Sequence, residues 1–496
     1  MINRLYKPDL SKFNLIRLLK QFSQKEVNEF DKFIRSPFFN NQSTLIRFYS
    51  ELKKFYPEFN HNKLTKENLY NSVNPGSEYN DIQLRKYFSN TYLLAEEYLI
   101  CLENNSNIER KKLDLMYQFD KRHLSDFYNK IVLEIEDIEK EQNKISSTYF
   151  CNNHFLEELK FTHYIRVNEL DKIPPSLINS HNFIILQLLL MTAVYSNILL
   201  INKKVYKDSW VNSYFEEFLK FFDFDNFYKK FDSISDEIKL FIELCKYDIL
   251  LSKDSCNEKY LLKMKELVFQ MSEFFNDNLL YTFISHLNIY YYINIHKGIG
   301  DYENEVFLNY KFMVEKGIYY TDGVKFVSFS EFRSILFTAL NLSEFKWAED
   351  FITEYGNCFP AEVRSNYLNF SLGCLNFEKK NYEKALEYFS ALKLDELILK
   401  LDVNVILAQI YYELNYIETA LSLSDSFKHF INSNNTISSE IRNGRLDFLK
   451  YYRLIINLKS KNTDIFKAEK IKKELIDNMN VTRKKWLLIK LNEIMQ

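Results

Sequence analysis

A pattern of small residues repeats between positions 366 and 427 and limits the chain to one class of fold. Gly373 and Ala385 recur as Ala408 and Ala420, so the small residues stand 12 positions apart within each copy and the copies stand 35 apart. Two helices of a hairpin can approach closely only where neither presents a large side chain. A repeat of this length is typical of stacked helical hairpins. The sequence therefore predicts an all-α superhelix of stacked helical hairpins with a helical N-terminal block.

The register of the repeat resembles that of the tetratricopeptide repeat. The residues that match the family's pattern are Leu372-Gly373, Ala385 and Phe389 in one copy, Leu407-Ala408, Tyr411 and Ala420 in the next, and Leu336, Ala348 and Pro360 upstream. The departures are Asn369 where the family prefers tryptophan, Leu336 at a small position, and Ser424 in place of an aromatic residue. The resemblance covers residues 327–434 and implies an α-solenoid of this type.

The resemblance also implies where a partner would bind. In the family, the first helix of each hairpin lines a concave groove, and the positions beside the small residue point into it. They map onto Arg333, Phe337, Asn341, Tyr367, Phe370, Ser371, Phe377, Gln409, Tyr412 and Glu413. A clamp for a peptide's terminal carboxylate needs Lys and Asn at several of these places, and only Arg333 and Asn341 come near that. The lining favours an apolar or amphipathic segment of a protein partner, although Tyr367 and Phe370 could instead pack against the next hairpin.

Helix boundaries are readable along the whole chain, and they suggest three regions. We expect an N-terminal helical block over 1–105, irregular helical repeats over 106–325, and regular repeats with a C-terminal capping helix over 326–496. In the last region, the predicted hairpins pair 327–342 with 344–355, 361–379 with 382–392, 395–414 with 417–432, and 437–458 with 463–478, before a final helix over 481–495.

The N-terminal block has its own signals. Ser23 and Glu26 form a capping box that starts a helix, and Ser36-Pro37 ends that helix, because the residue before proline is pushed out of the α region. Phe38 and Phe39 follow, and we expect them to plug the junction between two helices; the alternative is an exposed aromatic anchor for a partner. The first hundred residues resemble a family of uncharacterised bacterial helical-repeat proteins, a resemblance that brings no known activity with it.

Composition adds limits on partners and compartment. The chain has 65 basic and 67 acidic residues, so no global field attracts a polyanion, and nucleic acid is not an expected partner. Its six cysteines lack the spacing of a disulfide framework, which indicates free thiols in a reducing, cytoplasmic compartment. Aromatic residues make up 17% of the chain, and we interpret them as helix-packing residues.

No motif for catalysis is recognisable. Gly298 and Gly300 are turn residues without a preceding strand or a Lys-Ser pair, so they form no phosphate loop. The set Cys151, His154 and His163 lacks a fourth ligand, and His286 and His296 project in different directions. No nucleophile elbow occurs. We therefore expect a non-catalytic scaffold or adaptor that binds a protein segment, with no catalytic residue, no cofactor, no metal and no small-molecule substrate.

Two segments keep other functions open. Residues Phe183 to Ile201 carry no charge and are long enough to span a bilayer. We expect them to form a central helix that is buried on all sides, because Gln187, Thr192, Tyr195, Ser196 and Asn197 add polar groups; the alternative is a membrane-associated assembly factor. The basic C-terminal end could contact phosphates, or it could be a solvated cap; its cations are Lys467, Lys470, Lys472, Lys473, Arg483, Lys484, Lys485 and Lys490.

Overall fold

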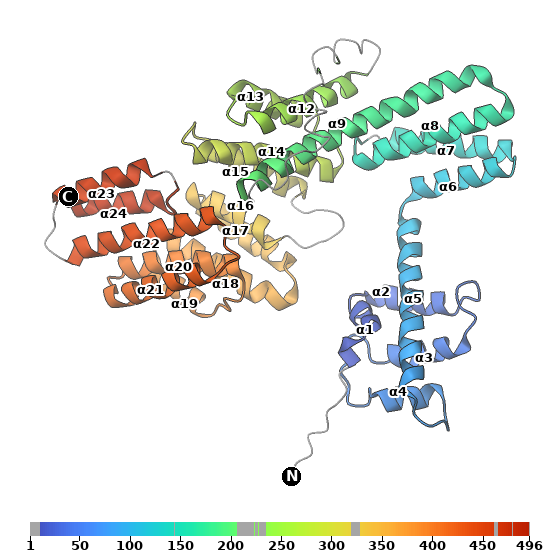
Figure 1. Ribbon diagram of the computed structural model, residues 1–496, viewed down its shortest axis with the longest axis horizontal. Coiled ribbons are helices and arrows are strands. Elements are labelled where there is room, and N and C mark those ends of the chain that lie inside the picture. Colours follow the sequence, from blue (N-terminus) through green and yellow to red (C-terminus); the bar gives the residue numbers. More distant parts are fainter. Residues whose placement is uncertain are drawn as a thin grey trace. The chain divides into compact units, whose positions relative to one another are not determined.

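The computed structural model describes residues 10–142, 144–205, 223, 227, 235–318, 328–460, 465–478 and 480–495. Within these ranges the chain forms 22 α-helices and no strand, with one isolated bridge between Ile145 and Phe275 (Figure 1). The all-α prediction is therefore confirmed. The chain divides into two compact units, Met1–Glu141 and Gln142–Gln496. The expected three-part division stays a prediction, and its boundary at 325 lies outside the described residues.

The first unit is built around a core of aromatic side chains. Phe30, Phe48 and Tyr49 are fully buried there, and Phe30 meets Tyr49 edge to face with ring centroids 4.7 Å apart. The capping box is confirmed, since the Glu26 amide donates to the Ser23 hydroxyl and the Ser23 amide to the Glu26 carboxylate. The helices are α1 (Asn14–Leu19), α2 (Gln24–Ile34), α3 (Ser43–Lys53), α4 (Lys66–Val73), α5 (Asp81–Ser106), α6 (Ile108–Lys121) and α7 (Ser125–Gln142).

Phe38 does not plug the junction between α2 and α3. Its side chain is 86% exposed, whereas Phe39 stacks on Phe33 with ring centroids 4.1 Å apart. The interior position belongs to Asn40, whose buried amide donates to the Ile34 carbonyl at 2.8 Å and so turns the chain. The expectation for Phe38 was wrong, because a polar side chain satisfies the end of α2 and leaves that ring outside.

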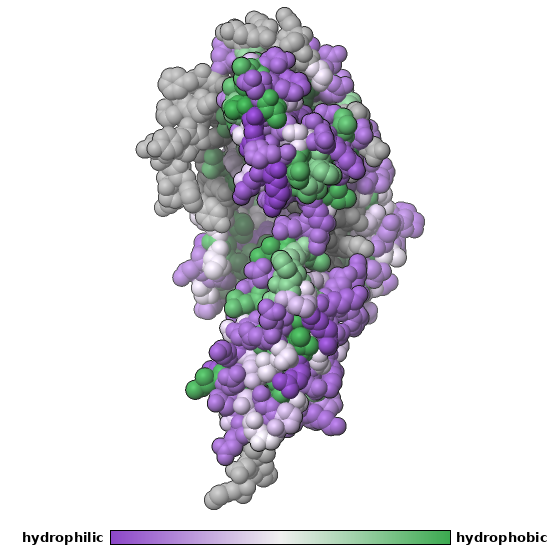
Figure 2. Space-filling model, turned by 90° about the vertical axis from the view of Figure 1, so that its right-hand side faces the viewer, coloured by the Kyte–Doolittle hydropathy of each residue, from purple (hydrophilic) through white to green (hydrophobic). Residues whose placement is uncertain are grey.

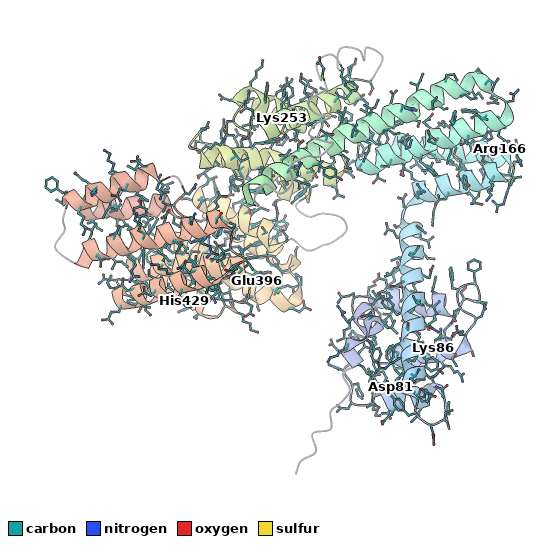
Figure 3. The ribbon with its side chains drawn as sticks, viewed as in Figure 1. Asp81, Lys86, Arg166, Lys253, Glu396 and His429 are labelled. Atoms are coloured by element: carbon teal, nitrogen blue, oxygen red, sulfur yellow. The ribbon has the colours of Figure 1, made fainter. Side chains whose placement is uncertain are left out.

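A charged cluster fixes the start of α5. Asp81, in its first turn (Figure 3), accepts hydrogen bonds from Lys66, Tyr79 and Arg85. These donors, with Lys66 first, hold the pKa of the Asp81 carboxyl well below its usual value of 3.8. The carboxylate also lies at a helix N-terminus, where negative charge is favourable. The cluster joins α4 to α5.

The second unit consists of helices that pack in consecutive pairs. Each hairpin contacts the next, so α17 packs on α18, α19 on α20 and α21 on α22. The predicted pairs from 327 onwards are confirmed to within a few residues at most ends. The helices are α8 (Ser147–Val167), α9 (Ile173–Val205), α12 (Asp236–Lys253), α13 (Glu258–Gln270), α14 (Asp277–His296), α15 (Glu303–Lys316), α16 (Phe329–Asn341), α17 (Phe345–Tyr355), α18 (Ala361–Glu378), α19 (Tyr382–Ser390), α20 (Leu397–Glu413), α21 (Ile417–Ser433), α22 (Ser439–Ser460), α23 (Ile465–Asp477) and α24 (Lys484–Met495).

Three successive hairpins turn in the same way. Ser343, Lys380 and Asn415 each follow the first helix of a pair with a positive φ of 61°, 63° and 61°. The backbone N–H of the next residue then donates to the carbonyl oxygen five residues earlier. The donor–acceptor pairs are Glu344–Ala339, Asn381–Asn376 and Tyr416–Tyr411, with distances of 2.8 to 2.9 Å. This is the hydrogen bond of a Schellman motif, which satisfies carbonyls at the end of a helix. The repeat in sequence is therefore a repeat in backbone geometry.

The small residues of the repeat are buried where helices approach. Gly373, Ala385, Ala408 and Ala420 all lie in the interior. A Cβ atom at Gly373 would stand 2.7 Å from Cε1 of Phe389, closer than real Cβ atoms come to other side chains. Gly373 is thus needed for the contact between α18 and α19.

Substituting alanine for Gly373 should test this contact. We expect Gly373→Ala to lower the free energy of unfolding by about 1–2 kcal/mol, because overpacking against Phe389 outweighs the better helix propensity of alanine. Urea unfolding followed by tryptophan fluorescence reports the second unit alone, since all three tryptophans lie within it. Ser365→Ala, at an exposed position of α18, is the control and should be neutral. An unchanged or raised stability for Gly373→Ala would contradict the close approach.

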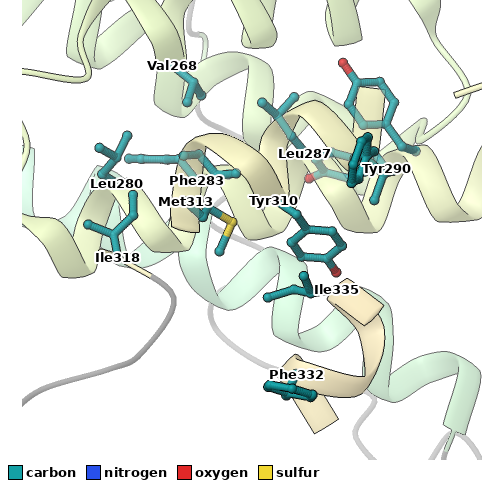
Figure 4. Packing of buried hydrophobic residues seen from close by; sticks show 14 of the residues in the cluster. Val268, Leu280, Phe283, Leu287, Tyr290, Tyr310, Met313, Ile318, Phe332 and Ile335 are labelled. Atoms are coloured by element: carbon teal, nitrogen blue, oxygen red, sulfur yellow. The ribbon is translucent and has the colours of Figure 1, made fainter. Parts of the chain in front are cut away.

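Aromatic and aliphatic side chains fill the space between successive pairs. Figure 4 shows Val268 of α13, Phe283 of α14, Tyr310 of α15 and Phe332 of α16 converging in one core. Each of these side chains is nearly inaccessible to solvent. On the face seen in Figure 2, hydrophilic residues predominate and hydrophobic ones gather in small groups. The aromatic content thus serves packing at these positions.

Helix α9 contains residues 183–201, of which the side chains of 200 and 201 lie outside the described residues. One face is buried against α8 and α12, but Ile184, Leu188, Tyr195 and Ile198 on the other are 44–50% exposed. The expectation of burial on all sides was wrong, because the helices that pack on α9 contact one side of it. Among the described residues, this helix alone, over Leu170–Leu199, is long and apolar enough to cross a membrane, with 39% of its most apolar window buried.

A buried polar cluster ties α9 to α12 and α14. The carboxylate of Asp248 on α12 lies 2.7 Å from Asn197 Nδ2 and 2.7 Å from His286 Nδ1, and the Tyr290 hydroxyl donates to it at 2.9 Å. Asp248 and Asn197 are fully buried. Burial, and then the Asp248 charge, raise the pKa of the Tyr290 hydroxyl well above its usual value, so it remains a donor at neutral pH.

Candidate functional site

A groove runs along the first helices of the last hairpins. It has a volume of about 800 Å³ and is lined mainly by residues of α16, α18, α20 and α22, with α24 forming its other wall and single residues added by α15, α17 and α19. A second depression of about 420 Å³ continues it towards α14 and α15 and shares Glu303, Asn341 and Lys484 with the first. Both volumes lie in the range of sites that hold small molecules or peptide side chains.

The structure brings six of the ten predicted groove residues together. Those that line the main groove are Arg333, Phe337, Asn341, Phe377, Gln409 and Glu413. The other four, Tyr367, Phe370, Ser371 and Tyr412, are buried between helices and lie outside its lining.

The four buried residues have structural contacts. Tyr367 stacks on Phe329 with ring centroids 4.1 Å apart and donates to Glu396, which is labelled in Figure 3. Ser371 donates to the Tyr367 carbonyl at 2.8 Å. The expectation that these four residues line the groove is therefore corrected. They lie on the buried side of their helices, next to the side that faces the groove. Packing against neighbouring hairpins, the alternative for Tyr367 and Phe370, is what their contacts support.

Helix α24 does more than cover the end of the last hairpin. Its Trp486 ring meets Tyr412 edge to face at 5.4 Å, and its indole N–H donates to Glu413 at 2.9 Å. Lys490 donates to Glu413 at 3.0 Å and to Glu493 at 2.9 Å. Burial lowers the Lys490 pKa, but the hydrogen bonds to Glu493 and Glu413 and the charges of these two carboxylates together raise it above its usual value. These contacts fix α24 against α20 as a wall of the groove.

Charged side chains from four helices meet at the floor of the groove. Asp402 on α20 is 7% exposed and accepts from Arg333 of α16 and, at 2.9 Å, from Arg445 of α22. Arg483, immediately before α24, donates to Glu378 of α18 at 3.2 Å. The guanidinium groups of Arg333 and Arg483 lie 4.8 and 5.8 Å from the centre of the Phe337 ring. Aromatic stacking of this kind holds the planar groups in place.

The floor carries strong electrostatic interactions. Burial lowers the pKa of the Arg445 guanidinium below its usual value, the Asp402 charge opposes this, and Arg333 and Arg483 lower it further. Arginine nevertheless stays charged in proteins. The three guanidinium groups are thus close enough to repel one another, and two carboxylates hold them together.

Two polar atoms of groove residues have no hydrogen-bond partner among the residues that the structure describes. The Nε–H of Arg445 is a buried donor without an acceptor, and Oε1 of Gln409 is a buried acceptor without a donor. Both residues line the groove, and Gln409 is only 1% exposed. A buried polar atom that lacks a hydrogen bond costs about 1–3 kcal/mol. Both atoms are closed to solvent in this structure, so a bound molecule gains these hydrogen bonds only if the surrounding side chains move.

The backbone at Arg483 is strained. Its φ is +52°, in the left-handed region that residues other than Gly, Asn and Asp rarely adopt. Such a conformation costs about 1–3 kcal/mol and persists where surrounding contacts impose it. Here the contacts are the ion pair with Glu378 and the ring of Phe337, so the side chain's place in the groove offsets the strain.

Sequence reasoning did not place most of the lining in the groove, and four of the missed residues make its main contacts. Asp402 and Arg445 carried no signal, because a single buried charge within a helix looks like any surface charge. Arg483 and Trp486 were assigned to the basic end and the cap. A signal existed in Arg483-Lys484-Lys485-Trp486, where three cations precede an aromatic residue at a helix start. Among the cations at that end, Arg483 and Lys490 form ion pairs within the described part of the fold, which leaves less charge for phosphate contacts.

The candidate metal ligands of the sequence are dispersed. His154 contacts the Ser180 hydroxyl, while His286 pairs with Asp248, and the side chain of His296 lies outside the described residues. No group of three or more His, Cys, Asp or Glu side chains is arranged to hold a metal in the part of the chain that the structure describes.

Comparison of the chain with protein-family models, with curated proteins and with solved structures finds no match in any of the three. Inference about function therefore rests on the groove itself. Its residues offer an aromatic wall, a charged floor and two unpaired polar atoms, gathered on the first helices of consecutive hairpins.

Proposed function

We propose that this protein is a non-catalytic scaffold or adaptor that binds a segment of a partner protein in the groove of α16, α18, α20, α22 and α24. The tetratricopeptide-like register supports this, because in that family the first helices line the binding surface. So does the position of the groove on the first helices of four hairpins. A cytoplasmic location fits the six cysteines, none of which forms a disulfide.

The groove and its mixed aromatic and charged lining carry the proposal, and two unpaired atoms buried beneath that lining add contacts that a segment can make once the side chains over them shift. A peptide group presents one carbonyl and one N–H, the two partners that the Arg445 Nε–H and the Gln409 Oε1 lack. A protein segment in extended or turn conformation has free groups of this kind. Satisfying both atoms removes a desolvation cost that the free protein bears.

The lining also indicates the character of the segment. Phe337, Phe377 and Trp486 supply aromatic surface, while seven basic and five acidic side chains line the rest of the main groove. Of the two kinds of segment that the sequence suggested, the amphipathic one fits this mixture. Aromatic residues and arginine are the types that dominate binding energy at protein interfaces.

Selection from random-sequence peptides tests the proposed function. The full chain, immobilised, should enrich peptides that bind it one to one with dissociation constants in about the micromolar range, as expected for a short segment in a pocket of this size. The control is the same selection on the chain unfolded in urea, which should enrich none of them. The absence of any enriched peptide on the folded chain, over repeated selections, would contradict the proposal.

A second candidate function rests on the exposed face of α9. Its apolar side chains could contact a bilayer, as a membrane-associated assembly factor would require. Fractionation of the native cell distinguishes the two. A chain recovered wholly in the soluble fraction without detergent excludes a membrane span, whereas release only by detergent would favour this candidate over a freely diffusing scaffold.

A further inference from the structure

The floor of the groove holds an uneven set of charges. Arg333, Arg445 and Arg483 supply three guanidinium groups, whereas Asp402 and Glu378 supply two carboxylates. Both oxygens of Asp402 are already used, since Oδ2 accepts from Arg333 and Oδ1 from Arg445. The cluster therefore retains one positive charge that no carboxylate of its own balances.

The surplus charge is held where a ligand can reach it. Arg333 and Arg483 are 26% and 25% exposed, and both line the groove. They share the ring of Phe337, so their guanidinium groups cannot turn away without losing that contact. Lys484 and Lys485 line the same wall and extend the positive region. A planar guanidinium presents paired N–H donors that fit the two oxygens of a carboxylate.

The residue type at position 483 points the same way. Its φ is positive, as at six other non-glycine residues of the described chain, and its side chain lines the groove. The ion pair with Glu378 does not require arginine, because a lysine can pair with a carboxylate. An arginine also offers more N–H donors than a lysine while its guanidinium lies over the Phe337 ring, 5.8 Å from the ring centre.

We propose that the bound protein segment carries an acidic side chain, aspartate or glutamate, whose carboxylate binds at the cluster of Arg333, Arg445 and Arg483 beside Phe337. This inference rests on the proposed function and names the class of segment that the groove selects. The segment combines that carboxylate with aromatic or aliphatic residues for Phe377 and Trp486. Free phosphate and nucleic acid share the negative charge of the carboxylate. They lack the backbone carbonyl and N–H of a peptide, which are the partners for the Arg445 Nε–H and for Gln409 Oε1.

A pair of peptides tests the charge requirement. The first is a fluorescein-labelled peptide in which glutamate alternates with phenylalanine, and the second has glutamine in place of each glutamate. We expect the full chain to bind the first about 10-fold more tightly or better, which is the effect of one charge-assisted contact, and the difference should shrink as salt is added.

Two single variants and their combination separate charge from structure. Arg483→Gln should abolish most of the preference for the glutamate peptide, whereas Glu378→Gln, which adds to the positive surplus, should increase it. The double variant should return towards the wild-type preference. Unfolding cannot imitate opposite effects from the two partners of one ion pair. Lys428→Gln, at an exposed position on α21 outside the groove, makes the same charge change and should have no effect.

The outcomes separate this inference from the proposed function. Equal affinity for both peptides, or selected peptides that lack acidic residues, would overturn the inference and leave the groove as a binding site for another segment. Stronger competition by inorganic phosphate or by a single-stranded oligonucleotide than by the glutamate peptide would also overturn it. If the folded chain binds no peptide from any source, the proposed function fails and the inference fails with it.

Discussion

Replacing Asp248 with alanine is expected to lower the free energy of unfolding of the second unit by about 3–5 kcal/mol, because it removes the centre of a buried polar cluster. Asn197, His286 and Tyr290 would each lose a hydrogen-bond partner that lies 2.7 to 2.9 Å away. The change would also leave a cavity at a fully buried site. Since the cluster joins α9, α12 and α14, the loss should weaken the packing of three helices together.

Tryptophan fluorescence in a urea titration measures this effect in the second unit. Asp236→Ala is the matched control, because Asp236 stands on the same helix with a side chain that is 92% exposed. Its removal should cost less than about 1 kcal/mol. If Asp248→Ala were no more destabilising than Asp236→Ala, the cluster would not be what fastens α9 to its neighbours.

Placing tryptophan at Asn341 is expected to weaken the binding of selected peptides about 100-fold or more, the combined cost of several lost contacts at an interface. Asn341 is the last residue of α16, is exposed, and lines both the main groove and its extension. A large ring there should fill the space that the segment occupies. The free energy of unfolding of Asn341→Trp should equal that of the wild type, because the substituted side chain is exposed.

Binding is measured by fluorescence anisotropy of labelled peptides. Two control variants show whether the loss of binding comes from filling the groove. Asn341→Ala removes the amide without filling space and should retain most of the affinity. Lys428→Trp adds a ring of the same size at an exposed site on α21, outside the groove, and should bind as the wild type does. Undiminished binding by Asn341→Trp would move the segment to another surface.

The hairpins could be predicted because their causes are local. A small residue where two helices touch, a capping serine and a polar turn all act within a few positions, so Gly373, Ser23 and Lys380 each mark structure near themselves. The predicted helix ends from 327 onwards accordingly agree with the observed ones to within a few residues at most ends.

The lining of the groove could be predicted only in part, because the rest of it depends on contacts between residues that are far apart in sequence. Asp402 meets Arg333 and Arg445, which lie 69 and 43 positions away in sequence. Periodicity shows which face of a helix is apolar but not which neighbour covers it. Tyr412 therefore appeared to be a groove residue, although Trp486 of α24 covers it. The open face of α9 escaped prediction for the same reason.

The most direct test of the central claim is to locate the bound segment by crosslinking. A selected peptide that carries benzoylphenylalanine in place of an aromatic residue is irradiated with the full chain, and the crosslinked residues are identified by mass spectrometry. We predict crosslinks to α16, α18, α20 and α24, above all at exposed residues such as Asn341, Lys485 and Ile489 that line the groove. Crosslinks confined to α9, to the first unit or to α21, none of which lines the groove, would contradict the assignment of the groove as the binding site.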